Sequence, residues 1–587
     1  MSIATRPFYF KSGRQSLFGW LHQPEEDRRS DLGVVICKPF GYEAMCAHGS
    51  IRAFADACAS AGATVLRFDY TGTGDSSGSD TDTNAVNQWC DDIRSAMDAL
   101  RHTGVTRFGL LGIRFGALLA SIVAGGDPSV EHLIAVAPVV SGRRHLRELR
   151  AFQATASSEE PADGANGAME VAGFHLSKAS VDRLAQLDLL GLPASIRSAL
   201  ILDREDLPGA KAWADALLER GSQVQYRALP GYLEMVATPH AAQIPRAMVS
   251  AAVEYLSTAA RSPAARKHAA AASDAAATTM RLMTAEGARL VERALFVDEA
   301  RTLFAITTEL ENSPPRPRTP YAHGVVMLNG GATSHIGPNR MYVELARRWA
   351  ASGYVVLRLD LAGLGDSATR PGQNRNEVYP PGALDDVSAA INFLRREFGV
   401  EHVTLAGLCA GAYHALRSAI SGLHVNTVLL VNPLTFYWRQ GSKLSDLQEA
   451  EVLANPGIYA EKIFSLASWR KVMDGRVNLW RVLMVFLRRA MMTVVSTVRD
   501  LSRLLRIKLP RDLGWELQSL ASRGVRIVFL FARGEVGQNL LRMQGGSAVQ
   551  SIGDRCRVHV IDGADHIFSQ GAARKKLAQI LTNELPR

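Results

Sequence analysis

Short apolar runs recur at regular intervals along both halves of the chain. Residues 16–21 alternate apolar with polar or small side chains, and residues 302–307 do the same in the second half, which is typical of half-buried strands. Continuous apolar runs at 34–37 and 325–328 have the pattern of strands that are buried on both faces. Because helical segments separate these runs, the pattern predicts an α/β fold, with mostly parallel sheets covered by helices on both faces.

The two halves also carry the same landmarks in the same order, which indicates an internal duplication. The segment VLRFDYTGTGDS at 65–76 is matched by VLRLDLAGLGDS at 356–367. Each contains a glycine-rich turn whose aspartate, Asp75 or Asp366, is expected to bond its own backbone and to be architectural rather than catalytic. Further along each half, an apolar strand leads into a turn that is bracketed by two glycines. We therefore predict two tandem domains of the same fold.

The length and composition agree with this division. A chain of 587 residues exceeds the size at which a single hydrophobic core stops growing, and 47% hydrophobic with 21% charged residues is ordinary for a folded protein. We expect a first domain at residues 1–258, an alanine-rich linker at 259–285 and a second domain at 286–587. Within the second domain, the segment 436–522 is expected to form a helical cap.

Charge and cysteine content exclude several classes of protein. The net charge of +9 comes from arginines spread along the chain, without the motifs of a nucleic-acid module, so no nucleic-acid partner is expected. The six cysteines form no CxxC pair, which argues against a disulfide framework and a zinc site. No metal or organic cofactor is predicted. Residues 1–30 lack the apolar core of a signal peptide, and no apolar run is long enough to span a membrane, so we expect a cytoplasmic protein.

The glycine-bracketed turns have the pattern of a nucleophile elbow. In the motif G-x-S-x-G the nucleophile lies on a strained turn between a strand and a helix, and glycines are needed where side chains would clash. The second turn, GLCAG at 407–411, has Cys409 at the nucleophile position. The first turn, GIRFG at 112–116, has Arg114 there, and a protonated guanidinium cannot attack a carbonyl.

Together these features resemble the α/β-hydrolase superfamily. Within it, the sequence is similar to the serine-aminopeptidase and lysophospholipase-like branch, including bacterial hydrolases found with exosortase systems. For the second domain the resemblance implies a triad of Cys409 as nucleophile, His566 as base and Glu535 as the acid that orients it. A cysteine can serve here, because a thiolate at a helix N-terminus beside a histidine is a good nucleophile. The alternatives are a buried structural thiol and a solvated loop carboxylate.

An oxyanion hole needs two backbone N–H groups that face the developing negative charge. The resemblance implies that one belongs to Ala410, directly after the nucleophile. The other would come from Gly330 or Gly331, in the loop after the apolar run 325–328. The alternative for this loop is a plain turn. His559, which alternates within the last strand, is expected to be a packed or surface residue.

In the first domain the same positions are replaced. Besides Arg114, the resemblance places Glu234 where the histidine is expected, while Asp206 remains as the acid candidate. We expect Arg114 to pair with Glu234 or Asp206 and, with Phe115, to fill the former pocket; an anion site is the alternative. His240 is expected to be structural.

The expected cap suggests the class of substrate. Residues 479–508 alternate apolar and cationic blocks at roughly helical spacing, which fits a cap over the site or, alternatively, peripheral contact with a membrane. Apolar walls favour a small-molecule acyl substrate. We therefore predict a Cys-His-Glu hydrolase or acyltransferase for acyl esters or thioesters, with a catalytically degenerate first domain. The competing class is a non-enzymatic pseudo-hydrolase that binds or scaffolds.

Overall fold

The computed structural model describes most of both halves of the chain. The described residues are 3–79, 85–156, 167–192, 196–260, 278–311, 322–442, 498–499, 501–503, 505, 507 and 509–586. Most of the expected cap and of the basic segment 479–508 therefore lies outside the described residues.

The first half forms an eight-stranded sheet in the order β1-β2-β4-β3-β5-β6-β9-β10. Its strands are β1 (Ala4–Ser12), β2 (Gln15–Gln23), β3 (Leu32–Cys37), β4 (Thr64–Phe68), β5 (Arg107–Ile113), β6 (Val130–Val136), β9 (Ser198–Arg204) and β10 (Gln223–Leu229). The pairs β1–β2 and β2–β4 are antiparallel, and the remaining pairs are parallel.

The second half forms a nine-stranded sheet in the order β11-β12-β13-β15-β14-β16-β17-β18-β19. Its strands are β11 (Thr279–Met283), β12 (Arg289–Phe296), β13 (Phe304–Leu310), β14 (His323–Leu328), β15 (Val355–Leu359), β16 (His402–Leu408), β17 (Thr427–Val431), β18 (Arg526–Ala532) and β19 (Cys556–Ile561). This sheet begins inside the segment 259–285 that the sequence suggested as a linker. Because Met280 is the only fully buried residue of β11, its apolar pattern was too weak to reveal a strand.

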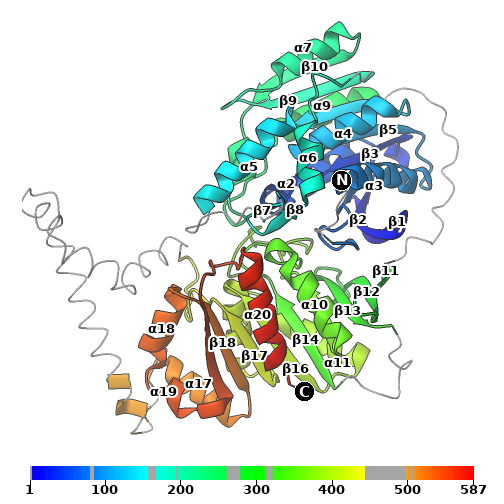
Figure 1. The fold of residues 1–587 in the computed structure, drawn as a ribbon. Coiled ribbons are helices and arrows are strands. Elements are labelled where there is room, and N and C mark those ends of the chain that lie inside the picture. Colours follow the sequence, from blue (N-terminus) through cyan, green and yellow to red (C-terminus); the bar gives the residue numbers. More distant parts are fainter. Residues whose placement is uncertain are drawn as a thin grey trace, which may run out of the picture.

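Helices cover both faces of each sheet (Figure 1), which confirms the predicted α/β class. In the first half, α2 (His48–Ser60) and α9 (Arg246–Ala260) pack on one face, and α3 (Ala85–Arg101), α4 (Phe115–Gly126) and α7 (Lys211–Glu219) pack on the other. In the second half, α10 (Met341–Ala351) and α20 (Gly571–Glu584) pack opposite α11 (Ala383–Phe398), α12 (Ala410–Ile420) and α17 (Leu513–Ser522).

The helix α17 corrects the expected extent of the cap. It lies within 436–522, yet Leu513, Leu517 and Leu520 are fully buried in the core beneath the sheet. The last part of the expected cap is thus a regular layer helix. Smaller elements complete the fold: α1 (Tyr42–Cys46), α5 (Gly142–Ala156), β7 (Met169–Val171), β8 (Phe174–Leu176), α6 (Lys178–Ala185), α8 (Tyr232–Met235), α18 (Val536–Gly545) and α19 (Ala548–Ser551), with single 3-10 turns at Glu26–Arg28, Pro338–Arg340 and Gly553–Arg555.

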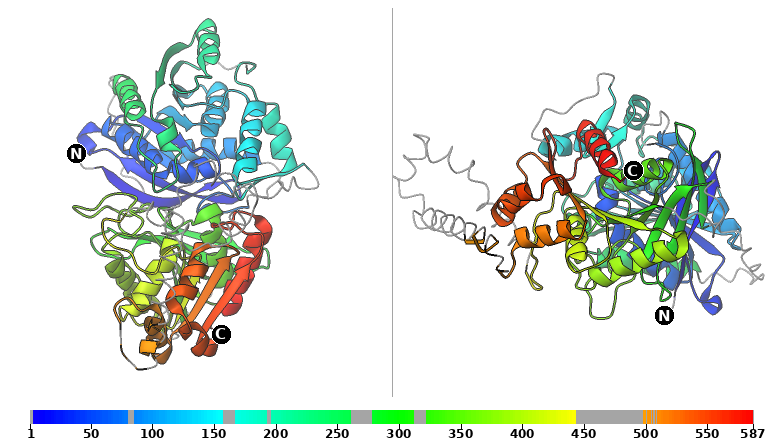
Figure 2. Two further views of the ribbon diagram at one scale, coloured as in Figure 1. Left: turned by 90° about the vertical axis from the view of Figure 1, so that its left-hand side faces the viewer. Right: turned by 90° about the horizontal axis from the view of Figure 1, so that it is seen from below.

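The two halves meet through their antiparallel strands. The strands β1 and β2 lie along the boundary with the second half (Figure 2). Trp20 of β2 packs edge-on against Phe304 of β13, with ring centroids 4.8 Å apart. These two rings belong to one apolar cluster from both halves: Tyr9, Phe18, Trp20, Met280, Ala294, Phe304 and Ile306.

Reciprocal ion pairs also cross this boundary. Arg67 of β4 donates to Asp366 at 2.7 Å, and Arg358 of β15 pairs with Asp75. Because these residues occupy matching positions of the two repeats, each half offers the other the same arginine and the same aspartate, as in a symmetric dimer interface. Asp75 and Asp366 are thus architectural, but the expectation that they bond their own turns is wrong, since their side chains serve the interface between the halves.

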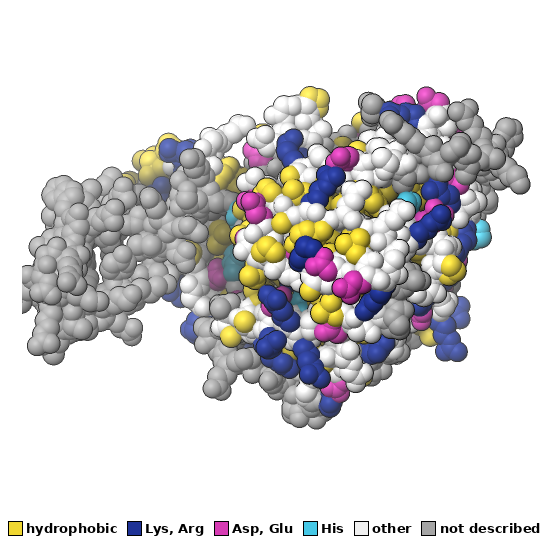
Figure 3. Space-filling view, turned by 90° about the horizontal axis from the view of Figure 1, so that it is seen from above, with side chains coloured by type: hydrophobic (Ala, Val, Ile, Leu, Met, Phe, Trp, Pro, Cys, Tyr) yellow, Lys and Arg dark blue, Asp and Glu magenta, His cyan; other side chains and the backbone are white. Residues whose placement is uncertain are grey.

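The charge distribution is mixed on the outer face of the first half. In Figure 3, basic side chains on that face are interspersed with acidic and apolar ones, so its described residues form no continuous basic patch. Among the helices that the structure describes, none has the length and apolar content required to cross a lipid bilayer. The cytoplasmic location stays a prediction.

Candidate active site

The two glycine-bracketed turns have the same backbone conformation. Cys409 has φ 57° and ψ −115°, and Arg114 has φ 53° and ψ −117°. Each residue precedes its helix and donates its N–H across the sheet, from Cys409 to Val431 at 2.8 Å and from Arg114 to Val136 at 2.9 Å. A positive φ at a residue with a side chain is strained by about 1–3 kcal/mol and is kept only where the surroundings enforce it. Both halves therefore retain the elbow.

The glycine after each elbow allows the helix to approach the neighbouring strand. A Cβ at Gly411 would lie 2.4 Å from the carbonyl oxygen of Leu328, and one at Gly116 would lie 2.1 Å from that of Cys37. Neither distance is possible for a side chain. The sequence pattern G-x-x-x-G thus reflects the packing of α12 and α4 against the ends of β14 and β3.

The three residues of the expected triad lie together. Glu535 directly precedes α18, His566 follows β19, and His566 Nδ1 lies 3.0 Å from Glu535 Oε2. His566 Nε2 is buried without a hydrogen bond of good geometry, although about a third of the side chain is exposed. Burial lowers the pKa of His566, but the adjacent Cys409 thiol and then Glu535 outweigh this effect and hold the pKa well above its usual range. The thiol of Cys409 itself is half-buried.

Asn432, which the sequence analysis missed, holds the histidine loop. It directly follows β17; its Nδ2 donates to the His566 carbonyl at 2.8 Å, and its Oδ1 accepts the N–H of Ala532 at 2.8 Å. The backbone of Asn432 has φ 43°, and the first half has Ala137 with φ 45° at the same place. A comparison of the two repeats could have revealed this residue, because the polar side chain is present only in the second.

The expected oxyanion loop lies beside the elbow. A Cβ on Gly330 would come within 3.4 Å of the Leu408 side chain, and Gly331 has φ 65° with open space around it. Ala410 is the first residue of α12, so its N–H has no partner within the helix. Gly330 therefore lies against Leu408, which directly precedes Cys409, and Ala410 directly follows it. The first half has Pro39 and Phe40 in place of the two loop glycines.

Tyr342 joins this loop to the elbow and was also missed by the sequence analysis. Its hydroxyl donates to the Leu328 carbonyl at 2.9 Å and accepts the N–H of Leu408 at 2.9 Å. It thereby fixes the ends of β14 and β16 relative to each other. When the two repeats are aligned on their matched strands, Ile51 of the first half occupies the position of Tyr342. This difference between the repeats could have identified Tyr342 from the sequence.

The wall above the elbow is aromatic in the described residues. Tyr379 stacks on Trp438 with centroids 4.3 Å apart and meets Tyr413 edge-on at 5.0 Å. The Tyr379 hydroxyl is buried without a hydrogen-bond partner, and burial and the nearby Cys409 raise its pKa. This wall continues from Ala410 and Ala332, so it faces the elbow.

A buried charge cluster lies behind the same loop. His335 places its two ring nitrogens 2.7 Å from Asp360 and 2.7 Å from Asp75 of the first half. Burial lowers its pKa, but these two carboxylates prevail and raise it to about 10. His335, Asp360 and Asp366 are close enough together to hold a metal ion, but the two ring nitrogens of His335 are already hydrogen-bonded to Asp360 and Asp75. The cluster is therefore a salt bridge between the halves.

The former site of the first half differs from expectation. Arg114 donates to Glu43 at 3.0 Å and to Glu148 at 2.8 Å, rather than to Glu234 or Asp206. Glu234 is exposed, and Asp206 pairs with Arg204 instead. The expected partners were wrong because the long side chain of Arg114 reaches the helices α1 and α5, which cover the elbow. No sequence motif indicates that these two helices lie beside Arg114.

In the segment of the first half that matches the histidine loop, Tyr232 and not Glu234 points toward Arg114. Its hydroxyl donates to Glu43 at 2.9 Å, and its ring centroid lies 5.4 Å from the Arg114 guanidinium carbon. Phe115 is buried in the core, and Arg114 borders cavities of about 370 and 140 Å³. The expectation that Arg114 and Phe115 fill the former pocket is therefore wrong. His240 is exposed, and His559 pairs with Glu584 at 2.9 Å.

Comparison with known families supports the same assignment in both halves. Residues 45–160 match the family model described as serine aminopeptidase, S33, and residues 325–580 match the model described as alpha/beta hydrolase family. No curated protein sequence matches the chain significantly.

Several solved structures are similar to one half of the chain. Est1E from Butyrivibrio proteoclasticus with ferulic acid is 16% identical over 42% of this chain and 97% of its own, with a TM-score of 0.33. Proline iminopeptidase from Mycobacterium smegmatis is 16% identical over 43% and 98%, with a TM-score of 0.32. An esterase from Pyrococcus furiosus is 15% identical over 44% and 92%, with a TM-score of 0.30.

Proposed function

Because the chain belongs to the α/β-hydrolase superfamily in both of its halves, we propose that the second half is a cysteine-dependent hydrolase or acyltransferase for acyl esters or thioesters. In this proposal Cys409 is the nucleophile, His566 is the general acid and base, and Glu535 orients the imidazole. The first half keeps the fold without the catalytic side chains.

The proposed reaction has two steps. The Cys409 thiolate adds to the substrate carbonyl, and the resulting oxyanion accepts hydrogen bonds from Ala410 N–H and from Gly330 or Gly331 N–H. Collapse expels the alcohol or thiol, which takes a proton from the His566 imidazolium, and leaves an acyl group on sulfur. Then His566 removes a proton from water or another acceptor, which attacks the thioester and releases Cys409.

The observation that carries the proposal is the position of His566 between two partners. Its Nδ1 is bonded to Glu535, and the Cys409 thiol acts on its pKa from the other side. A histidine placed between a thiol and an orienting carboxylate is the arrangement that a cysteine nucleophile and its base require. A protein that had lost its catalytic function would not be expected to keep three side chains from three loops in this arrangement.

The surroundings support an acyl substrate. Tyr379, Tyr413 and Trp438 give the described wall above the elbow an apolar, aromatic surface. Such a surface suits an acyl chain or an aromatic acyl group better than a sugar. We favour esters and thioesters over amides, because their leaving groups depart more readily from a tetrahedral intermediate formed by a thiolate.

The test is turnover of short-chain thioesters by the full chain. Cys409→Ala should lose at least about 10³-fold in kcat/KM, because the covalent step is gone and only binding and oxyanion stabilisation remain. Cys556→Ala, which removes a buried cysteine of β19, is the matched control and should retain activity. Unchanged turnover by Cys409→Ala contradicts the proposal. Absence of turnover of esters, thioesters and amides by the wild type favours a non-enzymatic binding protein.

Arg114→Ser separates the two halves. A serine at the first elbow should add no activity to Cys409→Ala, since Tyr232 and Glu43 lie where a base would be needed. Activity that returns in the double variant would mean that the first half retains a working site.

A further inference from the structure

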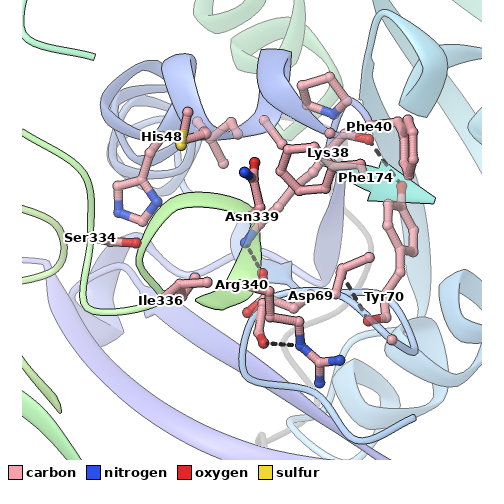
Figure 4. A pocket seen from close by; sticks show the side chains of 18 of the residues that line it. Lys38, Phe40, His48, Asp69, Tyr70, Phe174, Ser334, Ile336, Asn339 and Arg340 are labelled. Carbon is pink, nitrogen blue, oxygen red and sulfur yellow. Dashed lines mark hydrogen bonds and ion pairs between the residues drawn. The ribbon is translucent and has the colours of Figure 1, made fainter. Parts of the chain in front are cut away.

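A cavity lies between the two halves and does not include the triad. Its volume is about 110 Å³, and its lining comes from both halves. The first half contributes the loop that begins at Lys38, the turn after Asp69 and part of α3; the second half contributes the segment 333–340. Figure 4 shows these two sets of residues facing each other.

One wall of the cavity is a cluster of aromatic rings. Phe40 lies 5.6 Å from Trp89, 6.2 Å from Phe115 and 6.0 Å from Phe174, measured between ring centroids. Tyr70 continues the cluster at 5.7 Å from Trp89. A wall of this kind offers both stacking and edge contacts to a further flat ring.

The opposite wall includes Asn339, a buried polar side chain without a hydrogen-bond partner. Asn339 is 4% exposed, and neither its amide nitrogen nor its amide oxygen has a hydrogen-bond partner. Figure 4 shows this side chain rising from its loop into the space between His48 and Phe174. Its backbone is held at φ 52°, so the fold keeps an amide here in a strained conformation. Buried polar groups in folded proteins are generally hydrogen-bonded, so this amide has the chemistry of a recognition group.

The charged residues of the lining are already engaged. Lys38 Nζ lies 2.6 Å from Asp69 Oδ1, so these two charges compensate each other. Arg340 donates to the carbonyl groups of Gly74 at 2.9 Å and Gly78 at 3.0 Å. The cavity therefore combines an apolar, aromatic surface with the unpaired amide of Asn339.

We propose that this cavity binds a small, flat, uncharged aromatic molecule that carries a carboxamide or lactam group. The ring would pack against Phe40 and Phe174. The amide edge of the ligand would donate to the Asn339 oxygen and accept from the Asn339 nitrogen, because an asparagine amide needs one partner of each kind. A carboxylate fits poorly, since it cannot donate to the asparagine oxygen and would bury a charge.

This site gives the first half a function that needs no catalytic residue. The segment 333–340 continues directly from the loop that contains Gly330 and Gly331, so a bound ligand contacts the chain next to the proposed oxyanion hole. Binding itself is independent of catalysis, and its test requires no turnover.

The test uses benzamide, toluene and benzoate as probes with the full-length protein. Ligand-observed NMR and calorimetry should detect benzamide binding with a Kd of about 1 mM or tighter, as fits a fragment of this size. Toluene should bind at least about tenfold more weakly, because it leaves the Asn339 amide unpaired. Absence of benzamide binding to the wild type, or tighter binding of benzoate than of benzamide, overturns the proposal.

Two variants locate the binding. Asn339→Gly tolerates the positive φ and removes the amide, and it should weaken benzamide binding at least about tenfold. The matched control is Asn376→Gly, which makes the same change at φ 58° outside the cavity and should bind as the wild type does. Ala44→Leu, which keeps Asn339 but fills the cavity, should also lose binding. Wild-type affinity in both Asn339→Gly and Ala44→Leu would refute the site.

Discussion

At the scale of single residues, the two elbow regions have different side chains on a similar backbone. Cys409 and Arg114 have nearly the same φ and ψ, and Asn432 and Ala137 have nearly the same φ. The side chains differ in what they can do. Cys409 can react where Arg114 cannot, and Asn432 can hold the histidine loop where Ala137 cannot. The elbow of the first half keeps the backbone geometry and has an arginine at the nucleophile position.

Tyr342 is expected to position the oxyanion loop through its hydroxyl. Tyr342→Phe should lower kcat with little change in KM and should cost about 1–3 kcal/mol in the free energy of unfolding, because the buried Leu408 N–H loses its acceptor. The matched control is Tyr255→Phe, which removes a buried tyrosine hydroxyl of the first half that lies 2.6 Å from Ser198 Oγ. It should cost stability and leave turnover unchanged. An unchanged kcat in Tyr342→Phe would argue against a positioning role.

The pH dependence follows from the raised pKa of His566. The imidazolium form of His566 is present below this pKa and is lost as the pH rises through it. The alkaline limb of kcat/KM should therefore lie above the ordinary histidine value. In Glu535→Gln one of the groups that raise the pKa is removed, so that limb should move to lower pH. A limb that does not move would mean that Glu535 does not act on His566.

The sequence predicted the position of a site residue best where that residue follows the end of a strand. Cys409 and Glu535 each follow a strongly apolar strand, and His566 follows the last strand of the sheet, so their positions could be predicted and the structure brings them together. The partners of Arg114 could not be found in this way. Glu43 and Glu148 come from separate helices, and only the folded chain shows that a long arginine side chain reaches both.

At the scale of elements, the close contact between a helix start and a strand end defines the elbow. Both halves retain this contact, with Gly411 against Leu328 and Gly116 against Cys37. The strand β11 and the helix α17 show where sequence patterns were insufficient. One has a single buried residue and the other lies at the end of a long insertion, so neither was assigned to its layer.

Gly411→Ala and Gly116→Ala test the elbow as a unit. In each case the new methyl group meets a backbone carbonyl that cannot move aside, so both variants should be destabilised by about 1–3 kcal/mol or more. Only Gly411→Ala should also lower thioester turnover, because it displaces α12 and Ala410. Denaturant unfolding and steady-state kinetics check the two effects. Equal loss of activity in both variants would contradict the assignment of catalysis to the second half.

At the scale of the whole molecule, the two halves are joined by a shared apolar cluster and by buried charges. The ion pairs of Arg67 with Asp366 and of Arg358 with Asp75 repeat each other across the boundary. His335 adds a third connection, from the oxyanion loop of one half to Asp75 of the other. The first half therefore packs against the candidate site of the second half through these contacts.

Removing His335 should weaken this junction. His335→Ala leaves the buried carboxylates of Asp75 and Asp360 without their shared partner, with an expected cost of about 3–5 kcal/mol. Because the folded pKa of His335 is raised to about 10, its contribution is complete below the unfolded value near 6.5 and is lost as the pH rises through 10. Thermal unfolding against pH, with the exposed His102→Ala as control, measures both effects. A wild-type Tm in His335→Ala would refute this role.

The most direct test of the central claim is to identify the acylated residue. The full-length protein is mixed with a butanoyl thioester, quenched with acid within the first turnover and analysed by intact mass and peptide mapping. The account predicts one butanoyl group per chain on Cys409, none on the other five cysteines and none in Cys409→Ala. An acyl group on any other residue, or the same labelling in Cys409→Ala, would contradict it.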